Sequence, residues 1–111
     1  MELFGPILSI VRCKDLSHAL QIENSNEYGN ACSVFTSSGP LADRVVREAS
    51  AGMVGVNVGV PVPREPFSFG GINASKFGHG DMTGAHSLDL WTNLKKVTVK
   101  WEPQSESNWM S

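Results

Sequence analysis

Residues 31–58 of this chain read ACSVFTSSGPLADRVVREASAGMVGVNV, and they carry its clearest structural pattern. Residues 31–36 are short and largely apolar, which predicts a strand. Residues 40–49 predict a helix, because four apolar residues share one stripe at helical spacing: Leu41, Val45, Val46 and Ala49. Gly52 stands where the residue beyond the C-terminus of that helix is expected, and residues 53–58 predict a second apolar strand.

The same alternation extends upstream. Residues 7–13 are rich in β-branched and apolar side chains and predict a buried strand. Asp15 offers an N-cap for a helix over residues 16–23. Residues 7–58 therefore predict an α/β fold whose strands are joined by crossover helices into a parallel sheet. Because no element precedes the first strand to cover it, the chain reads as one entered in the middle of a fold.

Downstream, residues 59–84 contain many prolines and glycines, which break regular structure, together with two phenylalanines. A long ordered loop of this composition is usually functional. Residues 85–93 predict a short helix. Residues 96–101 alternate apolar with basic or hydroxyl side chains, which predicts a two-faced strand at a sheet edge or between subunits.

Length and charge exclude several classes of protein. The chain has 111 residues, enough for one domain, and a formal net charge of -2, so it has no basic field for nucleic acid or an anionic membrane. No apolar run is long enough to span a bilayer, and no secretory signal is readable at the N-terminus. With only two cysteines and no disulfide framework, we expect a reducing compartment, cytoplasm or mitochondrial matrix, and no secretion.

Metal binding and cysteine catalysis are not predicted. The candidate ligands lack the close spacing of a zinc half-site: Cys13, His18, Cys32, His79 and His86. Both cysteines fall in predicted apolar strands, where cysteine usually acts as a small buried hydrophobe rather than a nucleophile.

The N-terminal residues 2–6, ELFGP, leave two interpretations open. The carboxylate of Glu2 can accept hydrogen bonds from a ribose diol, and the ring of Phe4 can pack on a planar group. Equally, the same residues can be a polar position and a turn before a strand. Residue chemistry alone does not separate these two interpretations.

Six short motifs, in order and at compatible separations, resemble the C-terminal part of the aldehyde dehydrogenase superfamily. The resemblance covers roughly residues 2–101, and its motifs are Glu2-Leu3-Phe4-Gly5-Pro6, Asn26-Glu27-Tyr28-Gly29-Asn30, Val34-Phe35-Thr36, Gly52-Met53-Val54-Gly55-Val56-Asn57, Phe69-Gly70-Gly71 and Lys96-Val97-Thr98-Val99. Residues 56–63, VNVGVPVP, look most like the methylmalonate-semialdehyde dehydrogenases, which pass an acyl group to coenzyme A.

The resemblance implies roles for individual residues. Glu2 would hold the nicotinamide-ribose hydroxyls of NAD, or of NADP, and Phe4 would pack beside the nicotinamide. Phe69 would line the aldehyde tunnel near the reacting carbon. For Asn57, at the end of a strand, we favour a structural role in orienting loops.

The resemblance also divides the chain. Residues 1–93 would be the C-terminal part of the catalytic domain, 94–102 an oligomerisation strand and 103–111 a tail. The strand at 96–101 would pair with a neighbouring subunit in a homo-oligomer, a dimer or tetramer.

In this family the nucleophilic cysteine, the general base, the oxyanion-stabilising asparagine and the cofactor's glycine motif all lie upstream of the ELFGP motif. Neither cysteine matches the nucleophile, so we assign no catalytic residue and expect these residues to be inactive alone. The parent reaction would convert an aldehyde, NAD and coenzyme A to an acyl-CoA and NADH. The alternatives are a hydrolytic NAD(P)-dependent aldehyde dehydrogenase and a non-enzymatic module that docks onto complete subunits through residues 96–101.

Overall fold

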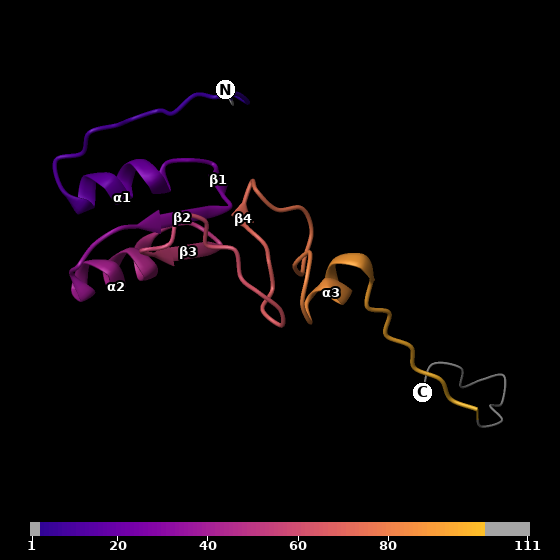
Figure 1. Ribbon diagram of the computed structural model, residues 1–111. Coiled ribbons are helices and arrows are strands. Elements are labelled where there is room, and N and C mark those ends of the chain that lie inside the picture. The colour runs from indigo at the N-terminus through magenta and orange to yellow at the C-terminus, as the bar shows by residue number, and fades with distance from the viewer. Residues whose placement is uncertain (1–2, 102–111) are drawn as a thin grey trace.

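The computed structural model describes residues 3–101 (Figure 1). Its elements follow the order α1 (Leu16–Asn24), β1 (Tyr28–Gly29), β2 (Ala31–Val34), α2 (Gly39–Glu48), β3 (Met53–Val56), β4 (Ile72–Asn73) and α3 (Ser87–Trp91). No helix among the described residues is long and apolar enough to cross a membrane.

The centre of the fold is the parallel pair of β2 and β3, as the sequence predicts. Their register places Ala31 opposite Met53 and Val34 opposite Val56. The helices α1 and α2 run alongside this pair (Figure 1). The apolar core lies between helices and sheet and consists of Leu20 from α1, Val45 from α2 and Met53 from β3.

Local capping explains where the two long helices begin. The Asp15 carboxylate accepts a hydrogen bond from the His18 N–H at 2.8 Å, which confirms the predicted N-cap of α1. At α2, Ser38 caps the Leu41 N–H and Pro40 occupies the first turn. The prediction for Gly52 is wrong, because α2 already ends at Glu48 with Ala49 as its C-cap.

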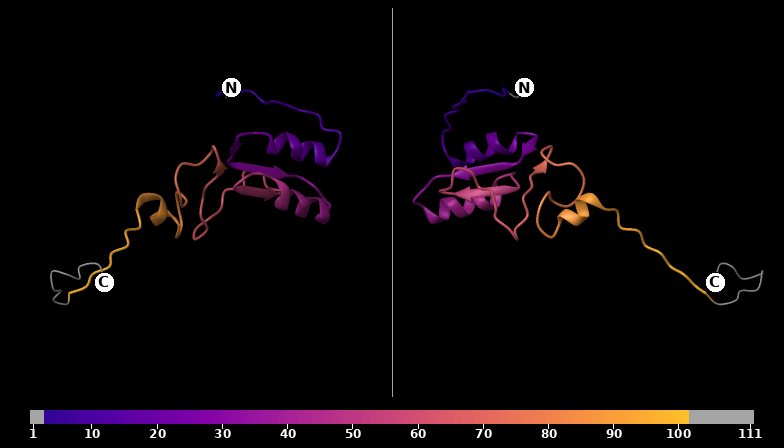
Figure 2. Two further views of the ribbon diagram at one scale, coloured as in Figure 1. Left: turned by 180° about the vertical axis from the view of Figure 1, so that it is seen from behind. Right: turned by 45° about the vertical axis from the view of Figure 1, so that its right-hand side comes forward.

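The predicted strand at residues 7–13 does not form. All of these residues are exposed and lie in no strand, and Cys13 is exposed rather than buried. A strand exists only through hydrogen bonds to a neighbour, and β2 pairs with β3 alone. The N-terminal segment therefore runs clear of the sheet (Figure 2).

A second, very short sheet was not predicted. β1 pairs antiparallel with β4, with Tyr28 opposite Asn73 and Gly29 opposite Ile72. Two-residue strands leave no periodicity to detect, yet this pairing fastens the loop at 59–84 to the rest of the molecule.

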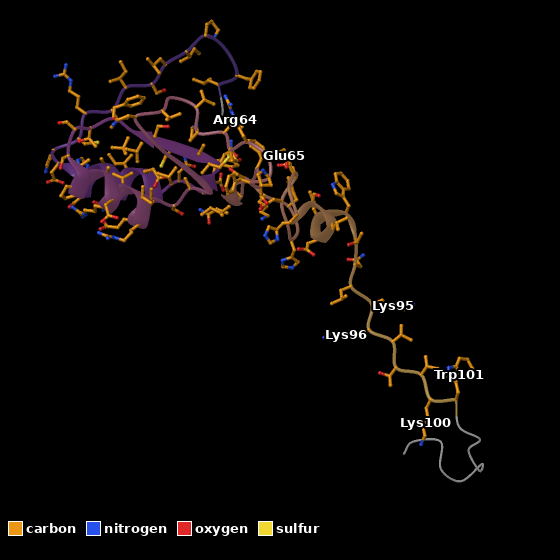
Figure 3. All side chains as sticks on the ribbon, turned by 60° about the horizontal axis from the view of Figure 1, so that its bottom comes forward. Arg64, Glu65, Lys95, Lys96, Lys100 and Trp101 are labelled. Atoms are coloured by element: carbon orange, nitrogen blue, oxygen red, sulfur yellow. The ribbon has the colours of Figure 1, made fainter. Side chains whose placement is uncertain are left out.

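The C-terminal region only partly matches its prediction. The helix α3 lies inside the predicted range 85–93, but no strand is assigned over 96–101. Figure 3 shows Lys95, Lys96, Lys100 and Trp101 along an extended segment that leaves the body of the molecule. The side chains of Val97, Val99 and Trp101 are exposed. With no strand beside it, this segment has no ladder to join, and its role between subunits stays a prediction.

Candidate functional site

Three segments that carry family-like motifs, residues 26–30, 52–57 and 69–71, contact one another through their glycines. A Cβ on Gly52 would lie 2.5 Å from the Gly70 carbonyl oxygen, and one on Gly29 would lie 2.6 Å from the Ser50 oxygen. A Cβ on Gly71 would be 3.0 Å from the Asn30 Cα. Backbone therefore packs directly on backbone here, which only glycine permits. The Gly52 N–H donates to the Gly29 carbonyl at 3.0 Å and closes the junction.

This junction positions Phe69, the predicted substrate-lining residue. Its neighbours Gly70 and Gly71 are held in the junction, and its own backbone is held by the opposite arm of the loop. The Phe69 N–H donates to Thr83 Oγ1 at 3.0 Å, and the Met82 N–H donates to the Phe69 carbonyl at 3.2 Å. The backbone of Phe69 is therefore held through both its N–H and its carbonyl group.

An ion pair supports the same loop. Lys76 Nζ lies 2.9 Å from Asp81 Oδ1, and both side chains are half-buried. The hydrogen bond from Lys76 lowers the pKa of Asp81, partly opposed by desolvation, and the Lys76 charge and a hydrogen bond from Ser68 lower it further. The Asp81 carboxylate also lies where a Cβ on Gly70 would stand, 2.5 Å from Oδ1. The charged pair therefore braces the loop beside Phe69.

A cavity of about 330 Å³ opens at this loop. Its wall is mainly aromatic and aliphatic, with the Lys76–Asp81 pair as its charged part. Its side chains come from the loop, from α3 and from the residue between β1 and β2: Phe69, Ser75, Lys76, Phe77, Asp81, Met82, Leu90, Trp91 and Asn30. A wall of this composition suits an apolar or partly apolar small molecule.

The sequence missed Lys76, Asp81, Thr83 and Trp91 as residues of this region. The available signal was weak: two opposite charges five positions apart inside a glycine-rich loop. Periodicity does not place the three loop residues, because the only regular element of the described loop is the two-residue strand β4.

Asn57 has a structural role, as we favoured from the sequence. Its φ of 56° is left-handed, which asparagine tolerates better than most residues. Its side-chain Oδ1 accepts from the Thr36 N–H at 2.9 Å and its Nδ2 donates to the Thr36 carbonyl at 3.0 Å. The amide thus continues the β2–β3 ladder by one step and fixes the loop that follows.

The structure does not bring all predicted site residues together. Phe4 is 99% exposed and is absent from the lining of the cavity that contains Phe69. Glu2 lies outside the described residues. The packing of Phe4 beside a nicotinamide therefore stays a prediction.

Within residues 3–101 no group of three or more His, Cys, Asp or Glu is placed to hold a metal ion. Burial, followed by the nearby charge of Glu23, raises the pKa of the half-buried Cys32 thiol. A thiol with a raised pKa is a poor nucleophile, in keeping with the structural role predicted for Cys32.

Comparison with known proteins shows which family and which proteins this chain is similar to. Residues 1–97 match the model of the aldehyde dehydrogenase family. The chain is 43% identical over 100 residues to malonate-semialdehyde dehydrogenase 2 of Shouchella clausii, covering 90% of this chain and 21% of that protein. It is 42% identical over 107 residues to the malonate-semialdehyde dehydrogenase of Pseudomonas aeruginosa, covering 96% and 21%.

Two solved structures share the fold. One is methylmalonate-semialdehyde dehydrogenase from Oceanimonas doudoroffii, with a TM-score of 0.79 and 36% identity over 94% of this chain and 21% of that chain. The other, from Sinorhizobium meliloti, is assigned as a methylmalonate-semialdehyde dehydrogenase complexed with NAD. It has a TM-score of 0.76 and 39% identity over 95% and 21%.

The chain thus spans about a fifth of the length of the relatives it matches. Within that fifth, the matched range contains the glycine junction, the loop of Phe69 and the parallel pair of β2 and β3. The chain belongs to the aldehyde dehydrogenase family.

Proposed function

We propose that this chain supplies the C-terminal part of an NAD-dependent semialdehyde dehydrogenase of the CoA-acylating type. The parent enzyme would convert a short carboxylated aldehyde, NAD and coenzyme A to an acyl-CoA and NADH. The observation that carries the proposal is sequence identity of about 40% to malonate- and methylmalonate-semialdehyde dehydrogenases along nine tenths of the chain. We place the parent in the cytoplasm or the mitochondrial matrix, and the name of a relative from Dictyostelium discoideum, which is given as mitochondrial, supports the second.

In this proposal the chain's own residues bind and orient. Phe69, fixed through its backbone by Thr83 and Met82, presents an apolar wall to the aldehyde and keeps water from the reacting carbon. Glu2 accepts hydrogen bonds from the ribose hydroxyls of the nicotinamide half, and Phe4 packs on its ring. NAD, when bound, supplies the acceptor for the hydride. The thiolate and its base come from the part of the family's fold that precedes the ELFGP motif.

The first test is activity of the 111 residues alone. Purified chain is incubated with malonate semialdehyde, NAD and coenzyme A, and NADH is followed at 340 nm. We expect no NADH above background, with the intact Shouchella clausii enzyme as the positive control. Turnover by the purified chain would overturn the assignment of catalysis to residues outside it.

The second test grafts the chain onto a relative. The matching fifth of the Shouchella clausii enzyme is replaced by this chain, and the products are separated by chromatography. We expect acyl-CoA and NADH in equal amounts, whereas free acid with no acyl-CoA would identify the hydrolytic alternative. Repeating the assay with NADP in place of NAD decides between the two cofactors.

Site residues are tested in the same graft. Phe69→Ala is expected to raise KM for the aldehyde by roughly tenfold, because about 1–2 kcal/mol of apolar contact is lost. Glu2→Gln is expected to raise KM for NAD while leaving KM for the aldehyde unchanged. Val60→Ala, at an exposed loop position outside the cavity of Phe69, is the matched control. An unchanged KM in both site variants would contradict the roles assigned to these residues.

A further inference from the structure

Asp81 contacts the residues on both sides of Phe69. Its carboxylate accepts a hydrogen bond from Ser68, the residue before Phe69. On the other side, its Oδ1 lies 2.5 Å from where a Cβ on Gly70 would stand, so the carboxylate packs directly on the Gly70 backbone. Only a residue without a Cβ leaves room for this contact. One carboxylate therefore spans the two residues that flank Phe69.

Lys76 holds this carboxylate in place. Its Nζ lies 2.9 Å from Asp81 Oδ1, and the two side chains are only 29% and 24% exposed. A charge-assisted hydrogen bond in such a sheltered place is stronger than one at the open surface. It requires an ionised Asp81, because a protonated carboxyl group loses the negative charge that attracts both Lys76 and the Ser68 hydroxyl. The contact of Asp81 with the flanks of Phe69 therefore depends on the charge of Asp81.

The other charged groups near Asp81 are more exposed. The charge of His86, just before α3, also lowers the pKa of Asp81, but less than the hydrogen bond from Lys76 does. His86 Nδ1 lies 3.6 Å from Oδ2 of Asp89 on α3, and those two side chains are 66% and 68% exposed. His79, two positions before Asp81, is exposed as well. Among the described residues, Lys76 is therefore the main partner of Asp81.

The same arm of the loop anchors the backbone of Phe69. The two residues that follow Asp81 make the contacts: Met82 donates to the Phe69 carbonyl, and Thr83 accepts from the Phe69 N–H. A shift of Asp81 therefore shifts both anchors, and with them the direction in which the Phe69 side chain enters the cavity of about 330 Å³. We propose that Asp81, oriented by Lys76, is a positioning residue for Phe69 and thereby sets the affinity of the site for the aldehyde. The proposal deepens the proposed function, on which its kinetic readout rests.

The first test uses the chain of 111 residues by itself and needs no activity. A fluorophenylalanine is placed at position 69, and its fluorine NMR line is followed as pH falls through the lowered pKa of Asp81. We expect the line to move with the same midpoint as the Asp81 carboxyl carbon. In Asp81→Asn the movement should be absent, and in Lys76→Met the midpoint should rise. A line that ignores pH, or that moves equally in Asp81→Asn, would overturn the proposal.

A second fluorine probe separates a local change from unfolding by acid. The same label at Phe35, an exposed residue outside the loop at 59–84, serves as the control. Its line should stay in place over this pH range. If the lines at positions 35 and 69 moved with one midpoint, the change would be global and the proposal would be wrong.

Kinetics in the graft test whether Asp81 acts through Phe69. Asp81→Asn keeps the size of the side chain and removes its charge, and we expect KM for the aldehyde to rise about fivefold with KM for NAD unchanged. In a Phe69→Ala background the same substitution should have no further effect, because the two residues act as a unit. Lys76→Arg keeps the cation and should retain the parent KM within about twofold. Asp43→Asn, which alters an exposed ion pair on α2, is the matched control.

Failure of this proposal and failure of the proposed function give different results. Additive effects of Asp81→Asn and Phe69→Ala on KM for the aldehyde would overturn the positioning role. So would an active graft whose KM does not change in Asp81→Asn. A graft that forms no NADH would refute the proposed function, and the fluorine titration would then decide the positioning role by itself.

Discussion

Gly52 shows at the scale of one residue why short glycine motifs recur along this chain. It neither ends a helix nor adopts a left-handed conformation; it lets the segment before β3 touch the backbone of residues 70–71. The nearest atoms belong to backbone, which cannot rotate away as a side chain can. The space requirement is therefore strict.

We predict that Gly52→Ala destabilises the fold by about 1–3 kcal/mol, because the added methyl group overpacks this junction. Gly59→Ala is the matched control, since a Cβ there has nothing within 4 Å. Urea unfolding of both variants measures the difference. Equal stability of the two variants would show that the junction is looser than the distances indicate.

The second prediction at this scale concerns the charge of Asp81. Lys76 lowers the pKa of this carboxyl group through a hydrogen bond and through its charge. Because the folded pKa lies below the unfolded one, the pair stabilises the loop above the ordinary carboxyl range, near pH 4, and this stabilisation is lost as pH falls through the lowered pKa.

Titration of the Asp81 carboxyl carbon by NMR should accordingly give a midpoint below the ordinary aspartate range. In Lys76→Met the midpoint should move upward, because both effects of the ammonium group are gone. Lys95→Met removes a lysine from the extended C-terminal segment and serves as control (Figure 3). An unchanged midpoint in Lys76→Met would show that the ion pair is absent in solution.

The helices are the elements whose backbone hydrogen bonds lie within one short stretch of sequence. The helices α1 and α2 match their predicted ranges closely, since each bonds within itself and begins at a side-chain cap next to it in sequence. Besides the hydrogen bond from Arg44 to Ser17, contacts link the two helices at their C-terminal ends. There Asn24 Nδ2 donates to the Glu48 carbonyl at 2.8 Å, and the Ser50 N–H donates to Asn24 Oδ1 at 2.7 Å.

At the element scale we predict that Asp15→Ala destabilises the chain by about 1 kcal/mol, because the His18 N–H loses its acceptor. Asp43→Ala is the control, since it removes only an exposed ion pair to Arg47, worth about 0.3–0.5 kcal/mol. Hydrogen exchange localises the effect: the first turn of α1 should exchange faster in Asp15→Ala alone. Uniform acceleration over both helices would contradict a local cap.

The whole molecule is extended and thinly packed for its length. Its radius of gyration is 22.3 Å, whereas a compact domain of 111 residues has about 13 Å. No described side chain is fully buried, and large apolar side chains are exposed from Leu3 to Trp101. Much of the apolar surface of the described residues is therefore left uncovered.

This extended shape predicts a small urea m-value, that is, a weak dependence of the unfolding free energy on urea concentration. The unfolded chain exposes about 17,400 Å² and the folded one 9689 Å², so unfolding exposes about 7,700 Å². A compact domain of the same mass would expose about 11,400 Å². The urea m-value should therefore be about two thirds of that usual for its length. A full-sized m-value would show that the isolated chain collapses or self-associates in solution.

The sequence by itself determined the family, the two long helices with their caps, the parallel pair of β2 and β3, and the structural role of Asn57. These features rest on short-range patterns: helical spacing, capping side chains and apolar runs flanked by turns. The role of Phe69 in lining the aldehyde tunnel came from resemblance to the family, and it stays a prediction.

Only the tertiary structure decided which apolar runs are strands. Residues 7–13 and 96–101 have strand-like sequences, yet neither forms a strand here, whereas the unremarkable residues of β1 and β4 do pair. It also decided that Gly52 serves a backbone contact and that Lys76, Asp81 and Thr83 brace the loop of Phe69. The physical reason is common to all of these: a strand, a close approach and an ion pair each need a partner distant along the chain or outside it.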